Sequence, residues 1–97
     1  MQSPTVLINV FEVPANTESE FVAWWKKSSE VLKKEPGFIE AKLHRSLQSG
    51  ARFQFINVAY WETEEALNLA RNRNKEILQS LTTGHGNPST YEVIAQY

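Results

Sequence analysis

Residues 51–61 read ARFQFINVAYW, and this run is the segment that decides the fold. It is rich in β-branched and aromatic residues, which favour strands, so we predict a strand here. Successive side chains of a strand point to opposite faces. One face would carry Phe53, Phe55, Asn57, Ala59 and Trp61, and the other Ile56, Val58 and Tyr60. Both faces are largely apolar, so both need a cover.

Three further strands are predicted around this one. Residues 38–46 form a strand that the short LQSG segment joins to 51–61 as a hairpin, with Gly50 at the tight position. Residues 5–13, TVLINVFEV, form the first strand and end at Pro14. The last strand is predicted at 90–97, TYEVIAQY, after the turn-rich stretch TTGHGNPS.

Two helical stretches lie between the strands. Thr17 and Glu20 have the spacing of a capping box, which predicts a helix that Pro36-Gly37 ends. Its buried stripe would consist of Phe21, Trp25, Ser28 and Leu32. Thr63 is the predicted N-cap of a second helix over 64–72, and residues 74–81 either continue it or form a separate segment.

The predicted order is β-α-β-β-α-β, an α+β ferredoxin-like fold in one domain over residues 1–97. Right-handed crossovers put both helices on one face of a four-stranded antiparallel sheet. The apolar second face then needs another cover, and the sheet of a second copy is the simplest one. We therefore expect a homodimer, a dimeric α/β barrel.

Composition narrows the classes of partner and chemistry. A formal net charge of −1 over 97 residues gives no reason to expect nucleic acid or an anionic membrane as partner. The chain has no cysteine, and its two histidines are far apart, so we expect no metal site. No apolar run approaches membrane-spanning length and no signal peptide is evident, so we expect a cytoplasmic protein.

Three motifs carry a likeness to a known family: INVFEVPAN at 8–16, EPGFIEAKLHRS at 35–46 and NVAYWETEEAL at 57–67. Their order and spacing resemble those of the antibiotic-biosynthesis-monooxygenase family. The resemblance covers about residues 5–97 and implies a ligand cavity between the helices and the sheet. The family includes quinone-forming monooxygenases and haem degraders, so the likeness is more specific for fold than for activity.

The resemblance also implies roles for individual residues. His44 matches the base of the quinone-forming members, although a strand histidine can also be purely structural. Asn57 and Trp61 match their hydrogen-bond donors, although Trp61 could instead be a core aromatic. The expected catalytic set is therefore His44, Asn57 and Trp61, and the expected substrate-binding set is Asn9, Trp25, Phe53, Phe55 and Leu67.

Two departures from the family pattern affect the expected activity. Haem-degrading members hold iron with a histidine near the end of the second helix, where this chain reads LARNR at 69–73, so haem binding is not expected. Quinone-forming members carry a tyrosine where this chain has Leu67, and Lys75 stands near the place of a family arginine.

The sequence thus predicts a cofactor-independent monooxygenase that acts with O₂ on an electron-rich aromatic, of phenolic or polyketide-like type. The alternative is a non-enzymatic dimeric α/β barrel that binds a small hydrophobic ligand, which the loss of the tyrosine favours. A haem-degrading monooxygenase is the third and least supported interpretation.

Overall fold

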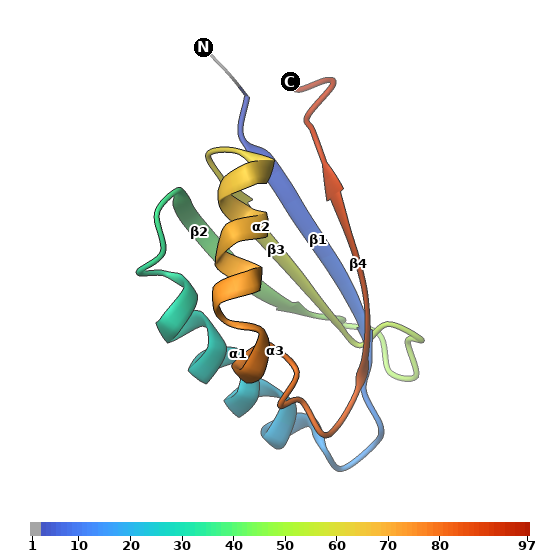
Figure 1. Cartoon of the computed structure of the whole chain (residues 1–97). Helices are drawn as coiled ribbons and strands as arrows, with labels where there is room; N and C mark the ends of the chain where they lie inside the picture. The colour runs from blue at the N-terminus through green and yellow to red at the C-terminus, as the bar shows by residue number, and fades with distance from the viewer. Residues whose placement is uncertain (1–2) are drawn as a thin grey trace.

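The predicted order of elements is confirmed in the computed structural model, which describes residues 3–97 (Figure 1). The strands are β1 Thr5–Glu12, β2 Phe38–Arg45, β3 Phe55–Trp61 and β4 His85–Tyr91. The helices are α1 Glu18–Leu32, α2 Glu64–Arg73 and the one-turn α3 Lys75–Leu78. Residues 74–81 therefore contain a separate short helix rather than a continuation of α2.

The four strands form one antiparallel sheet in the order β2-β3-β1-β4, which is the ferredoxin-like arrangement. The helices lie on one face of it (Figure 1). Strand register fixes which residues share that face: Leu7 is opposite Ala59, and Asn9 is opposite Asn57. The other face, which we call the outer face, carries Ile8, Val10, Ile56, Val58 and Tyr60 on the two central strands.

Two apolar clusters hold the helices to the sheet. Phe11, Phe21 and Phe55 form one, with ring centroids 4.7 Å apart for Phe11–Phe21 and 5.0 Å for Phe21–Phe55. The other cluster contains Trp61 and residues of α2. Asn9 and Asn57 lie midway along β1 and β3, between the two clusters. The helix-facing side of the sheet is therefore polar at its centre.

The N-terminal caps of the two long helices agree only in part with the sequence prediction. The hydroxyl of Thr63 accepts a hydrogen bond from the Ala66 backbone N–H at 3.0 Å and caps α2 as predicted. The capping box predicted for α1 is wrong, because the hydroxyl of Thr17 donates to the Pro14 carbonyl at 2.7 Å. Thr17 therefore closes the preceding turn instead of capping the helix.

Two predicted strands are displaced. The last strand is His85–Tyr91 rather than 90–97, because the backbone of 85–91 pairs with β1 along its whole length. Glu92 to Tyr97 are exposed and belong to no strand. The third strand begins at Phe55 rather than at residue 51, which leaves Phe53 in the loop between β2 and β3. Within residues 3–97, no helix has the length and apolar character that crossing a bilayer requires.

Candidate functional site

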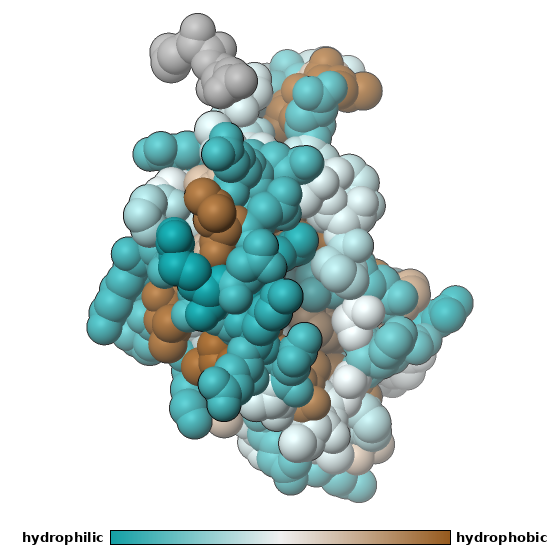
Figure 2. Space-filling view, in the orientation of Figure 1, coloured by the Kyte–Doolittle hydropathy of each residue, from teal (hydrophilic) through white to brown (hydrophobic). Residues whose placement is uncertain are grey.

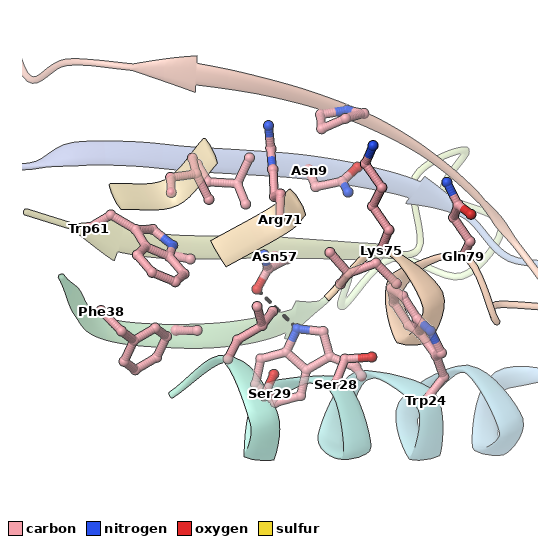
Figure 3. A pocket seen from close by; sticks show the side chains of 18 of the residues that line it. Asn9, Trp24, Ser28, Ser29, Phe38, Asn57, Trp61, Arg71, Lys75 and Gln79 are labelled. Atoms are coloured by element: carbon pink, nitrogen blue, oxygen red, sulfur yellow. Dashed lines mark hydrogen bonds between the residues drawn. The ribbon is translucent and has the colours of Figure 1, made fainter. Parts of the chain in front are cut away.

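A cavity of about 340 Å³ lies between the helices and the helix-facing side of the sheet (Figure 3). This volume is at the lower end of the range for small-molecule sites, about 300–1,000 Å³. Its walls are mostly apolar and aromatic and come from all four strands and all three helices. The exposed residues among those that line it, which mark its mouth, are Asn72, Lys75, Gln79 and Pro88.

Asn57 is held at the centre of the cavity by Trp25. The indole Nε1–H of Trp25 donates to Oδ1 of Asn57 at 3.0 Å, the dashed line of Figure 3. An indole N–H can only donate, so the amide oxygen must face Trp25. The two N–H donors of the Asn57 amide are then left for whatever occupies the cavity.

Two more polar groups in the cavity wall lack a partner. Oδ1 of Asn9 and Oγ of Ser28 are buried, and neither has a hydrogen-bond partner within residues 3–97. A buried polar atom left unpaired costs about 1–3 kcal/mol. A ligand or a water molecule with polar atoms at this level would remove that cost.

Trp61 is both a core residue and a wall of the cavity. Its side chain is 1% exposed, and its ring meets that of Phe38 edge-on with centroids 5.3 Å apart. Leu67, which is 2% exposed, lines the same region. The two interpretations of Trp61 made from sequence are therefore compatible, since a buried ring can hold the fold and contact a ligand.

The structure places in the site several residues that the expected catalytic and substrate-binding sets left out, and Trp24 and Arg71 are two of them. Trp24 lines the cavity, and its Nε1–H donates to the Ile77 carbonyl at 3.1 Å, which ties α1 to α3. Arg71 lines it from α2 and is half-buried; burial lowers the pKa of its guanidinium, and the charge of Glu64 opposes that shift. The available signal was the position of Arg71, four residues after Leu67 and so on the same helix face.

His44 does not lie where the sequence interpretation needs it. It pairs with Ile56 across the β2–β3 ladder, whereas Asn57 pairs with Leu43. His44 therefore belongs to the outer face, where it is exposed and its Nδ1 lies 3.4 Å from the Ile56 carbonyl. The expectation that His44 reaches the cavity is wrong. Neighbouring residues of a strand point to opposite faces, so Leu43 shares the face of Asn57 and His44 points the other way.

Two predicted wall residues also lie elsewhere. Phe55 is in the strand as expected, but it is 2% exposed and packs in the phenylalanine cluster outside the cavity wall. Phe53 lies in the β2–β3 loop, with the guanidinium of Arg52 at 4.9 Å from its ring centroid. Phe11, Trp24 and Phe38 form the aromatic wall with Trp25 and Trp61 instead.

The residues that line the cavity do not fit a haem iron. None of them is a histidine, cysteine, methionine or tyrosine, which are the side chains that serve as axial ligands. Within residues 3–97 there is also no group of three or more His, Cys, Asp or Glu side chains able to hold a metal ion.

Comparison with protein-family models matches residues 4–76 to antibiotic biosynthesis monooxygenase. Among solved structures, the chain is similar to a candidate monooxygenase from Shewanella loihica, with 33% identity over 99% of both chains and a TM-score of 0.88. A comparison with curated proteins finds no significant match.

Two further structures share the fold at lower identity. SnoaB from Streptomyces nogalater, a cofactor-independent oxygenase, is 16% identical over 98% of this chain and 97% of its own, with a TM-score of 0.78. The haem degrader MhuD from Mycobacterium tuberculosis, solved with two haems in its active site, is 23% identical over 97% of this chain and 99% of its own, with a TM-score of 0.72. The family match and the Shewanella likeness support a monooxygenase type of function. The chain belongs to the antibiotic biosynthesis monooxygenase family.

Proposed function

We propose that the protein is a cofactor-independent monooxygenase that oxidises a flat, electron-rich aromatic compound with O₂. The observation that carries this proposal is the amide of Asn57, which Trp25 orients so that its N–H donors face an aromatic-walled cavity. Such a cavity suits a phenolic or quinoid ring system with an oxygen at the level of Asn57.

Both ring stacking and hydrogen bonding contribute to substrate binding in this proposal. Trp61 and Phe38 lie on one side of the cavity centre and Trp24 on the other, as Figure 3 shows. The ring system of the substrate contacts these side chains, and its oxygen accepts from the Asn57 amide. Asn9 lies opposite Asn57 on β1 and offers a second polar contact at the same level.

The chemistry requires the substrate to ionise and then to react with O₂. The substrate anion gives one electron to O₂, and the resulting radical pair combines to a C–O bond. Loss of water from this peroxide leaves a carbonyl, so one oxygen atom enters the product and the other leaves as water. The substrate supplies all the electrons, and the N–H donors of Asn57 stabilise the anion in a site screened from water.

Among residues 3–97, the cavity wall offers no side-chain base to accept the proton. Histidine, tyrosine and carboxylate side chains are absent from the described residues that line it. We therefore assign the proton to water at the mouth. Phenols have pKa values near 10, so the site must stabilise the anion by several kcal/mol for the reaction to run at neutral pH.

Oxygen consumption tests the proposal. With a panel of dihydroxynaphthalenes and anthrones, we expect uptake that Asn57→Ala lowers about 100-fold, the loss typical of one oxyanion donor. His44→Ala is the matched control, because His44 is exposed on the outer face, and it should retain uptake. An unchanged rate in Asn57→Ala would contradict the assignment of the amide.

The alternative function is a non-enzymatic barrel that binds a small hydrophobic ligand. Leu67, which lines the cavity where the quinone-forming members carry tyrosine, favours it, as does the lack of a base in the described wall. Tight binding of the same aromatics without any oxygen uptake would support this alternative against the enzyme.

We also propose that two copies associate through the outer face. Its centre is apolar on β1 and β3, and its edges are polar: Glu40, Lys42 and His44 on β2, and Asn87 and Ser89 on β4. An apolar centre with a polar rim is the usual anatomy of a protein interface. By contrast, the surface over α2 is largely hydrophilic (Figure 2).

A further inference from the structure

The cavity is positively charged although the protein is not. Its described lining includes two cations, Arg71 of α2 and Lys75 of α3, and no carboxylate, in a chain of formal net charge −1. We propose that its ligand is an aromatic acid, whose rings lie among the tryptophan and phenylalanine side chains and whose carboxylate pairs with Arg71 and Lys75. This inference rests on the proposed function and names its substrate class.

Arg71 has the environment of a binding residue. Its guanidinium is half-buried, and no carboxylate of residues 3–97 lies within ion-pair distance of it. Burial lowers the pKa of Arg71, as expected for a charge that loses water without gaining a partner. Glu64 acts on it only through space, and Oε2 of Glu64 accepts the hydroxyl hydrogen bond of Thr90 at 3.1 Å.

Arg73 shows the contrast on the same helix. Its Nε donates to Oε2 of Glu35 at 2.9 Å, outside the cavity. Two residues away, Arg71 faces inward with Leu67, so its position is not a general property of arginines on α2. A half-buried, unpaired guanidinium costs stability in the empty protein, and an anionic ligand would offset that cost.

The two cations lie at different depths. Figure 3 shows Arg71 and Lys75 reaching from the helices over the cavity on the side of Asn9. Lys75 is exposed at the mouth, whereas Arg71 is farther in. The planar guanidinium presents paired N–H donors that match the two oxygens of a carboxylate. The acid group would thus lie toward the mouth while the rings extend toward Trp61 and Phe38.

Fluorescence titration of the whole protein tests this directly. All three tryptophans line the cavity, so their emission reports binding without turnover. The probes are 2-naphthoate and 2-naphthamide, which have similar shapes and differ in charge. We expect 2-naphthoate to bind at least about tenfold more tightly than 2-naphthamide, the gain typical of a charge-assisted hydrogen bond. In Arg71→Gln this preference should fall below about threefold.

Two variants make the result specific. Arg73→Gln removes the same charge from the same helix outside the cavity and should keep the preference. Lys75→Gln should also reduce the preference for the acid. Because Lys75 is exposed, this variant should fold and can test the inference even if Arg71→Gln does not fold. High salt should weaken naphthoate binding more than naphthamide binding.

The outcomes separate this inference from the proposed function. Equal affinity for the two probes, no quenching by either, or a preference that survives both Arg71→Gln and Lys75→Gln would overturn the aromatic-acid inference. The oxygen-uptake test uses neutral dihydroxynaphthalenes and would be unaffected by that result. An acid preference that depends on Arg71, without oxygen uptake on any substrate, would keep the inference and refute the monooxygenase.

Discussion

Asn57 illustrates how a polar side chain is accommodated on an otherwise apolar strand face. The sequence places it on the same face as Ala59 and Trp61 by alternation alone, and the structure has it there. Its partner was not predictable, because Trp25 comes from a helix 32 residues away in sequence and meets it only after the helix packs. Alternation assigns a face to a residue, whereas tertiary packing decides its contacts.

The bond between Trp25 and Asn57 gives a residue-scale prediction. Trp25→Phe keeps an aromatic ring but removes the one donor within residues 3–97 that fixes the amide oxygen, so the amide can rotate and present its oxygen to the substrate anion. We expect stability to fall by only about 1 kcal/mol and oxygen uptake to fall about tenfold. Urea unfolding and uptake measured on the same preparation check the two values.

Trp24→Phe is the control for that substitution. Trp24 is the neighbouring tryptophan, and its N–H bonds to the Ile77 carbonyl instead of to Asn57. Because Phe keeps an aromatic ring in the cavity wall, we expect a similar loss of stability and weaker substrate binding, but uptake at saturating substrate largely preserved. If both variants lost uptake equally, the amide orientation would not be the cause.

Elements with strong local signals were predictable, and those that depend on a neighbour were not. Residues 55–61 are rich in strand-forming residues, and Thr63 caps its helix, so β3 and α2 are close to the sequence prediction. β4 reads HGNPSTY, a turn-like composition, and it is a strand because β1 supplies the ladder beside it. The more strand-like segment 92–97 has no such neighbour among the described residues.

His44 was misplaced for a related reason. The predicted boundaries of β2 were nearly correct, but the face of each residue depends on register, and there is an irregularity between Phe38 and Glu40. The family likeness suggested that His44 is the catalytic base. The strand register, however, pairs His44 with Ile56 rather than with Asn57, which puts it on the outer face. Correct boundaries therefore did not ensure a correct site.

The junction before β2 gives an element-scale prediction. Gly37 has φ 88°, and a Cβ there would lie 2.5 Å from Cβ of Ala66 on α2. Gly37→Ala should destabilise the protein by about 2–4 kcal/mol, since it combines a left-handed alanine with overpacking against the helix. Thermal and urea unfolding measure this loss.

Gly50→Ala is the matched control for the contact. Gly50 has φ 77°, but a Cβ there would meet nothing within 4 Å. We expect only the backbone cost, about 1–2 kcal/mol. Equal losses in the two variants would mean that the approach of Gly37 to Ala66 contributes nothing.

For the whole molecule, the outer face remains the main prediction. The sequence argument was that both faces of the central strands are apolar, and in the folded chain the helices cover only one of them (Figure 1). Dimerisation thus follows from pattern and fold together, and it is a prediction about association in solution.

Val58→Asp tests it at micromolar concentration by light scattering. Val58 lies on the outer face opposite Ile8, and a carboxylate there would lose water without a partner, so the variant should be monomeric while the parent protein is a dimer. Val31→Asp adds the same charge on α1, away from the outer face, and should remain dimeric. A monomeric parent protein would rule out the proposed assembly.

The position of β4 at the sheet edge bears on how this cavity can diversify. Pro88 and Gly86 lie on the helix-facing side, opposite Asn9 and Phe11 respectively, and a Cβ at Gly86 would come within 2.8 Å of both side chains. Gly86 is therefore constrained by its neighbours. An edge strand is bonded to one neighbour only, and most of β4 is exposed, so its other positions are under few packing demands. Apart from Gly86, residues 85–91 are the stretch where evolution, or a protein engineer, could reshape the ligand specificity of this scaffold at least cost to the rest of the fold.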